Sequence, residues 1–110
     1  MASVSASALE TRAKMVELAR RMLSGETDLF EGARTMAALG RNLTEAEGLD
    51  SDVLTFVAVD SELDDIPFGD ARQRWAPDAL KEKDRQRDDY LVKARPALEQ
   101  ACRAIATRYS

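Results

Sequence analysis

Apolar residues recur along most of this chain at intervals of three and four, which is the spacing of a single buried face on an α-helix. The first such stretch follows Ser5 and Ser7, either of which can cap a helix, and ends at Ser24. Gly25 then occupies the position where glycine commonly ends a helix. We therefore predict a first helix whose inner face consists of Leu9, Met15, Val16, Ala19, Met22 and Leu23.

A second helix is predicted from Asp28 to Gly40. Asp28 can cap this helix, and Glu31 stands three residues later, as in a capping box. Gly32 costs a helix interior up to about 1 kcal/mol relative to alanine, so we interpret it as a point where two helices approach closely. The expected inner face consists of Leu29, Phe30, Ala33, Met36 and Ala37.

The segment VLTFVAV at residues 53–59 is ambiguous, because Val, Thr and Phe also favour β-strands. No second segment offers a strand partner, and a lone strand would leave its backbone groups unpaired. We therefore predict a mostly buried helix from Asp52 to about Asp64, capped by Asp50 or Ser51. Its expected inward-facing residues are Val53, Phe56, Val57 and Leu63.

A turn is expected at residues 66–69, IPFG, because proline disfavours helical geometry in the residue before it. A short helical piece should follow from Asp70 to Trp75. Pro77 suits the first turn of a long last helix, where its missing N–H would be unsatisfied anyway.

The last helix changes character along its length. Residues 81–89, KEKDRQRDD, contain no apolar residue, and opposite charges recur three apart, as on a solvated face. Pro96 should kink the helix, because it removes a backbone donor and its ring clashes with the preceding turn. The expected inner face consists of Leu91, Leu98, Cys102, Ile105 and Tyr109.

These elements predict an all-α fold, a small bundle of four to five helices with a long C-terminal helix kinked near Pro96. We expect residues 1–110 to form one domain, with residues 1–6 frayed. The composition agrees, because 45% of the residues are hydrophobic and only 5 are Gly and 3 Pro, too few for a chain of short strands and turns.

Charge and composition narrow the function. The net charge is −4 without a long basic tract, which disfavours nucleic-acid binding and favours a protein partner with a basic surface. With 1 Cys and no His, internal disulfides and His-dependent catalytic or metal sites are excluded, and a reducing cytoplasm is expected. No stretch resembles a secretion signal or a membrane span, so we expect a cytoplasmic protein that does not bind membranes.

Four acids lie within six residues in DSELDD at 60–65, where the count of acids is highest in the chain: Asp60, Glu62, Asp64 and Asp65. A calcium loop would need glycine at the sixth position and a bidentate glutamate at the twelfth, where this chain has Asp65 and Ala71. A catalytic carboxylate pair lacks any recognisable catalytic partner. We therefore expect no metal, no cofactor and no catalytic residue here.

Two interpretations of this acidic segment stay open. The acids and Arg72 can form an internally paired, solvated turn, because Arg72 or Arg74 can pair with them locally. Alternatively, the acids form a binding surface for a basic partner, with Phe68 as the apolar anchor. Acids at a helix C-terminus, where the macrodipole is negative, cost stability unless a basic group compensates their charge. The candidate partner-binding residues are Asp60, Glu62, Asp64, Asp65, Phe68 and Arg72, whereas Trp75 is predicted to be structural and to lie in the core.

Four segments carry a resemblance: GETDLFEGAR at 25–34, FVAVDSELD at 56–64, PxGxxRxxW at 67–75 and ALxxKD at 79–84. Together they resemble a family of small bacterial proteins without an assigned activity, over about residues 18–109. Small cytoplasmic proteins of this kind include immunity proteins, which neutralise a cognate toxin. The matching motif positions are Asp60, Glu62, Asp64, Arg72 and Trp75.

The expected function is therefore a non-catalytic protein-binding module, most concretely an immunity-type inhibitor whose acids occlude the basic active site of a toxin. One alternative is a structural or regulatory homodimer that buries residues 52–64 and the apolar end of the last helix. The other is a small carboxylate-dependent hydrolase.

Overall fold

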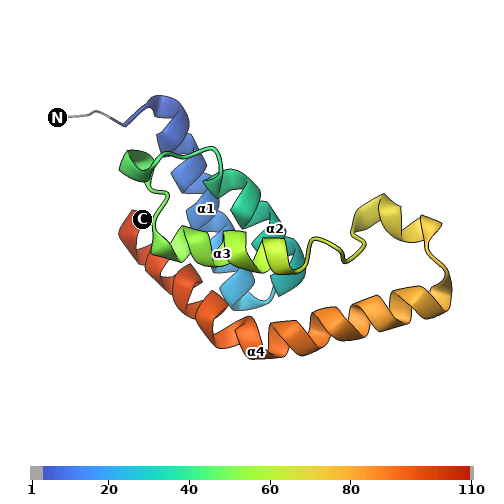
Figure 1. The fold of residues 1–110 in the computed structure, drawn as a ribbon. Coiled ribbons are helices and arrows are strands. Elements are labelled where there is room, and N and C mark those ends of the chain that lie inside the picture. The colour runs from blue at the N-terminus through green and yellow to red at the C-terminus, as the bar shows by residue number, and fades with distance from the viewer. Residues whose placement is uncertain (1–3, 110) are drawn as a thin grey trace.

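The helices of this chain occupy most of residues 4–109, the part that the computed structural model describes (Figure 1). Within that range there are four α-helices, two short 3-10 helices and no strand, which confirms the predicted all-α fold. In chain order they are α1 Ala6–Ser24, α2 Leu29–Gly40, η1 Glu45–Glu47, α3 Ser51–Glu62, η2 Gly69–Arg74 and α4 Pro77–Tyr109.

Helix α1 begins and ends where local capping predicts. The hydroxyl of Ser5 accepts a hydrogen bond from the Ala8 amide at 3.1 Å, and Gly25 ends the helix at a φ of 86°, a value that favours glycine. The predicted inner face is correct except at its edges, where Leu9 is 54% and Leu23 38% exposed. Ala8 takes the inward position near the start of the helix, so Leu9 is rotated toward solvent.

Helices α1 and α2 approach closely at Gly32, as predicted. A Cβ added at Gly32 would lie 2.6 Å from the Met22 Cγ of α1, closer than real side chains permit. The Sδ of Met22 lies 3.9 Å from the Sγ of Cys102, which belongs to α4. Three helices thus meet around one methionine because α2 has no side chain at this position.

The ambiguous segment 53–59 is helical and forms most of α3. The Asp50 carboxylate caps this helix by accepting hydrogen bonds from the amides of Asp52 and Val53 at 3.0 and 3.2 Å. Val53 and Phe56 are completely buried, so the strand-favouring side chains lie in the core. Burial between helices has overridden their local preference for strands.

Helix α4 consists of two halves with different environments. The two halves run in different directions in Figure 1, the bend expected near Pro96, which lies inside the helix. The second half contributes Leu98, Ala101, Cys102 and Ile105 to the core. Leu91, predicted for the same inner face, is only partly buried and packs at the edge of the core.

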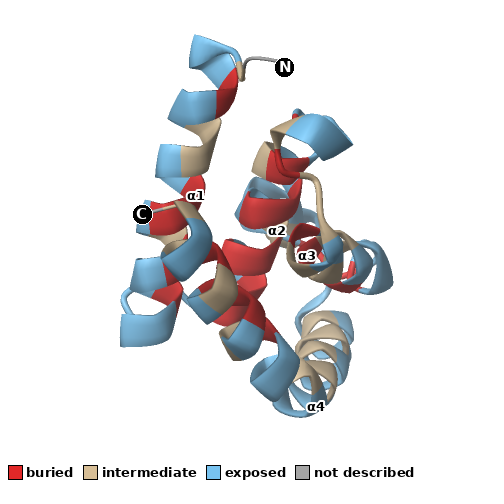
Figure 2. Ribbon diagram, turned by 90° about the vertical axis from the view of Figure 1, so that its left-hand side faces the viewer, coloured by how far each residue is buried: buried red, intermediate tan, exposed pale blue. Residues whose placement is uncertain are grey.

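The first half of α4 and η2 form an extension that we call the arm, residues 68–97. No residue of this range is buried, whereas the other segments carry the buried positions (Figure 2). The molecule measures 54 × 25 × 21 Å, and the arm projects away from the bundle along its length (Figure 1). Tyr90, Leu91 and Ala94 pack partly buried against the edge of the core, and most of the other contacts of the arm are polar and surround the candidate site.

The expectation that residues 1–6 are frayed can be compared with the structure only for residues 4–6. Residues 1–3 lie outside the described residues. Val4 packs partly buried against the core, and Ser5 caps α1. None of the helices in the described part of the chain is both long enough and apolar enough to cross a bilayer.

Candidate partner-binding surface

Asp60, in the last turn of α3, is paired with arginines of α2 and the residue that follows it. Its carboxylate lies 2.9 Å from the Arg41 guanidinium and 4.0 Å from Arg34 Nε, and only 14% of the side chain is exposed. The Nη1 atom of Arg34 is itself buried without a hydrogen-bond partner among the described residues. Asp60 therefore ties α3 to α2, and of the predicted acids it is the one least accessible to a partner.

Asp65 is also paired, in this case across the turn to the arm. Its carboxylate accepts a hydrogen bond from Lys83 Nζ at 2.7 Å. This hydrogen bond lowers the pKa of Asp65 below its ordinary value, although the carboxylate stays well exposed. The Lys83 ammonium also lies 5.9 Å from the centroid of the Trp75 ring, so one lysine contacts Asp65 before the arm and Trp75 within it.

Arg72 holds the arm together. Its guanidinium donates to both carboxylate oxygens of Asp84 at 2.8 Å, and Nη1 also reaches the Pro67 carbonyl at 3.5 Å. The hydrogen bonds from Arg72 lower the pKa of Asp84, and Asp84 raises the pKa of Arg72. The predicted local pairing of Arg72 with acids of the turn is therefore wrong, because a bidentate partner is available on α4.

Three other acids near the turn have no partner. Glu62, Asp64 and Asp70 are exposed and make no hydrogen bond or ion pair with any described residue. We call these three residues the acidic strip. Glu62 is the last residue of α3, whose last turn contains no basic residue, so its charge meets the negative end of the helix dipole uncompensated.

The negative charge of Glu62 in the acidic strip affects the pKa of a tyrosine on α4. The pKa of Tyr90 is raised, first by burial of its hydroxyl and then by the negative charge of Glu62. Asp70 was not among the predicted binding residues, although it follows Gly69 in the same turn. The position of Asp70 in the sequence, five residues after the DSELDD segment, was the signal that could have identified it as a binding residue.

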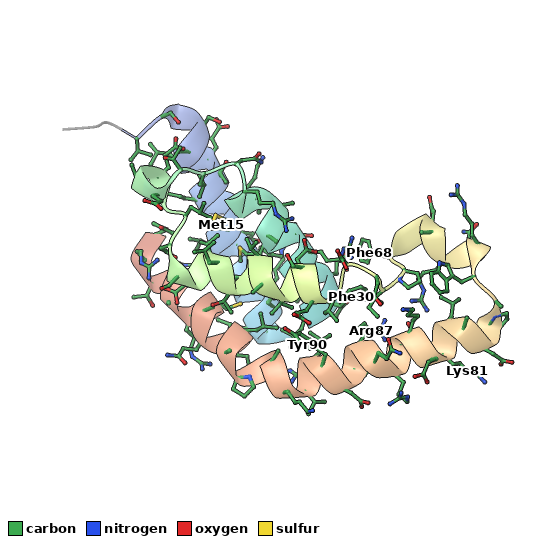
Figure 3. The ribbon with its side chains drawn as sticks, in the orientation of Figure 1. Met15, Phe30, Phe68, Lys81, Arg87 and Tyr90 are labelled. Carbon is green, nitrogen blue, oxygen red and sulfur yellow. The ribbon has the colours of Figure 1, made fainter. Side chains whose placement is uncertain are left out.

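Phe68 is 41% exposed, but one side of its ring is fixed. The ring meets Phe30 of α2 in an edge-to-face contact, with centroids 5.6 Å apart and planes at 84° (Figure 3). The Arg34 guanidinium carbon lies 5.0 Å from the Phe68 centroid. The predicted anchor thus packs against α2 on one side of its ring and does not project freely from the surface.

Beside Phe68 there is a groove between α2, the turn and α4, with a volume of about 610 Å³. Its floor includes buried Leu29 and Phe30, and the Arg87 guanidinium carbon lies 5.5 Å from the Phe30 centroid (Figure 3). Both apolar and charged residues line it. The lining residues are Asp28, Leu29, Phe30, Pro67, Phe68, Gly69, Arg72, Arg87, Asp88, Leu91, Val92 and Arg95.

Trp75 lies at the surface, and the prediction that it belongs to the core is wrong. The indole is 39% exposed, at the point where η2 has ended and the backbone is extended, with φ −101° and ψ 143°. The arm has no core that could enclose a side chain of this size, and the Lys83 ammonium covers part of the ring. The indole is therefore a visible part of the candidate surface.

Two kinds of chemical group, metal ligands and the single thiol, can be assessed among the described residues. Among residues 4–109 no three His, Cys, Asp or Glu side chains are grouped closely enough to hold a metal ion. Burial raises the pKa of the Cys102 thiol to about 11, so it is protonated near neutral pH. Exposed carboxylates, two partly exposed aromatic rings and an apolar groove suit protein recognition.

No protein-family model matches this chain, and neither a curated protein nor a solved structure matches it.

Proposed function

We propose that this chain is a non-catalytic cytoplasmic binding module for a protein with a basic surface. The observation that carries the proposal is the acidic strip, three exposed carboxylates that have no ion pair or hydrogen bond among residues 4–109 and that lie in the same short segment, residues 62–70, as the partly exposed ring of Phe68. Neighbouring acids that serve the fold are paired, as Asp60 and Asp65 are. Unpaired like charges repel one another, and a basic partner would relieve that repulsion and associate faster.

The most concrete form of this function is immunity-type inhibition of a toxin. An enzyme that acts on nucleic acid or nucleotides needs a basic cleft to attract phosphate groups. The acidic strip would compete with the substrate for that cleft. Inhibition would then result from occlusion and would require no chemistry from this chain.

Capture from extracts of the native host tests the proposal. The tagged wild type is compared with a variant that carries Glu62→Gln, Asp64→Asn and Asp70→Asn. A matched control neutralises three other exposed acids that make no side-chain ion pair, Glu10, Glu26 and Glu45. We expect one stoichiometric basic protein with the wild type and the control, and its loss with the strip variant.

Two results would contradict the proposal. Equal capture by the strip variant would show that the strip is not the interface. Absence of any stoichiometric partner from the host would exclude a binding function of this kind. Circular dichroism of each variant verifies that loss of capture is not loss of fold. We expect the fold to persist, because none of the three strip side chains makes a hydrogen bond or ion pair with residues 4–109.

A homodimer is a second candidate, and one observation favours it. Residues 68–97 contain no buried residue, and Phe68, Trp75 and Val92 are 41, 39 and 72% exposed within them. A second copy could cover these residues across a two-fold axis. Light scattering after size exclusion decides this point, because a dimer would double the mass at micromolar concentration without any added protein.

A further inference from the structure

The molecule exposes more surface than a compact chain of its size. Its radius of gyration is 14.9 Å, whereas a compact domain of 110 residues has one of about 13 Å. Its accessible surface is 6782 Å², compared with the about 6,100 Å² that a folded monomer of 12.2 kDa exposes. The excess of roughly 700 Å² is close to the roughly 800 Å² that each partner contributes to a stable interface. The arm accounts for this elongated shape (Figure 1).

The arm exposes apolar side chains near both of its ends. Trp75 is 39% exposed and lies at the tip, between the end of η2 and the start of α4. Phe68 and Val92, near the base of the arm, are 41 and 72% exposed. Between them, residues 81–89 contain no apolar residue. A partner that covers the arm must therefore meet both apolar anchors and a charged middle section.

The arm and the rest of the chain, which forms the bundle, have opposite net charges. Residues 68–97 contain eight Lys or Arg and six Asp or Glu, a net charge of +2. Because the whole chain has −4, the bundle has −6. Arg74, Lys81 and Lys93 of the arm are exposed and make no hydrogen bond or ion pair among residues 4–109. The bundle of a second copy offers the negative surface that these cations lack within their own chain.

We infer that the chain forms a two-fold dimer by exchange of arms, in which the arm of each copy lies on the bundle of the other. Packing of arm on arm would bring together two segments of net charge +2, so electrostatics favours the contact between arm and bundle. The helical part of the arm, residues 77–97, extends about 30 Å, which is enough to cross a bundle of this molecule's width, 25 × 21 Å. The two-fold axis repeats the contact, so the excess surface of both copies is covered. This inference rests on the homodimer, the second candidate function, and does not depend on the acidic strip.

Sedimentation equilibrium of the full chain, with Trp75 fluorescence measured at the same concentrations, tests the dimer. We expect the mass to double with a dissociation constant below about 100 µM. The chain has one tryptophan, so its emission reports on the tip of the arm and should shift to shorter wavelength as the dimer forms. A chain that is still monomeric at about 100 µM would overturn the inference, and so would a dimer that forms without a change in Trp75 emission.

Matched charge variants decide which surface the arm covers. The arm variant neutralises one Arg and one Lys near the tip, by Arg74→Gln and Lys81→Gln. The control neutralises one Arg and one Lys of the bundle that are equally exposed and unpaired among residues 4–109, by Arg20→Gln and Lys14→Gln. Because the two-fold axis doubles each loss, we expect the arm variant to raise the dissociation constant at least about fivefold and the control not to raise it.

Two results with these variants would overturn the exchange of arms. An unchanged or lower dissociation constant in the arm variant would indicate packing of arm on arm, where removal of positive charge relieves repulsion. An equal rise in the arm variant and the control would show that the arm has no special part in the dimer. Circular dichroism of both variants verifies that the fold persists.

The same proteins distinguish this inference from the proposal of a basic partner. The arm variant keeps Glu62, Asp64 and Asp70, so it should still capture the basic protein although it dimerises less. A monomeric wild type that captures a basic protein would overturn the dimer and retain the acidic strip. A dimer that captures no basic protein would retain the exchange of arms and reject the strip.

Discussion

Replacing Phe68 with alanine should destabilise the protein even though the ring is partly exposed. With 41% exposure, roughly 60% of the side-chain surface is removed from water, which is about 120 Å² for a ring that can bury about 200 Å². At about 25 cal/mol per Å² this is about 3 kcal/mol, and a compact unfolded chain reduces it to about 2 kcal/mol. The edge contact with Phe30 adds about 0.5–1 kcal/mol.

The free energy of unfolding is measured by urea denaturation, followed by circular dichroism. We expect Phe68→Ala to lower it by about 2–3 kcal/mol, with a matching decrease of roughly 8–15 °C in the melting temperature. Val92→Ala is the control, because a side chain that is 72% exposed should cost less than about 0.5 kcal/mol. A loss below about 0.5 kcal/mol for Phe68→Ala would contradict the packing of this ring against Phe30 and would favour a freely projecting anchor.

Three further predictions concern the rest of the molecule. Gly40→Ala should lower the stability by about 1–2 kcal/mol in thermal melts, because overpacking outweighs the helix propensity gained: its Cβ would lie within van der Waals overlap of the rigid, buried side chain of Val53. The ion pair of Asp84 lowers its pKa, so its contribution is present above the ordinary value of about 4 and is lost as the pH falls through the lowered pKa. As the pH is lowered below about 4, Trp75 fluorescence should therefore change before the helical circular dichroism does. Coincident changes would contradict the expectation that the arm loosens before the bundle unfolds. Cys102 is buried and its thiol has a pKa of about 11, so iodoacetamide should alkylate it at least about 100-fold faster in urea than in the native state, and equal rates would contradict its burial.

The helices were predictable because their signals are local. Ser5 and Asp28 cap helices through hydrogen bonds that span three residues, and the apolar spacing identifies most of the buried face of α1. The segment 53–59 needed an additional physical argument. Its residues favour strands locally, but a strand without a partner could not satisfy its backbone, and α3 is indeed a helix.

The candidate surface was only partly predictable, because its organisation depends on contacts between distant residues. Arg72 pairs with Asp84, twelve positions later, and nothing in the local charge pattern favours that acid over closer ones. Likewise Lys83 neutralises Asp65 only because α4 folds back beside the turn. Which acids stay unpaired follows from those contacts, so the strip could be recognised only in three dimensions.

The prediction that Trp75 lies in the core was wrong for a different physical reason. A lone tryptophan in a small domain is usually placed in the core because of its large apolar surface. Here the arm turns away from the bundle, so residues 68–97 have no core into which the indole could be buried. The bend of α4 and the direction of the arm are tertiary features that hydrophobic spacing does not encode.

Hydrogen–deuterium exchange of the chain, with and without its captured partner, tests whether the partner binds at this surface. We expect slower exchange in residues 62–75, which include the acidic strip, and in residues 87–95 of α4, several of which line the groove. The exposed side of α1 should exchange equally in both samples. Protection confined to α1, with the arm unchanged, would contradict the assignment of this surface to the partner.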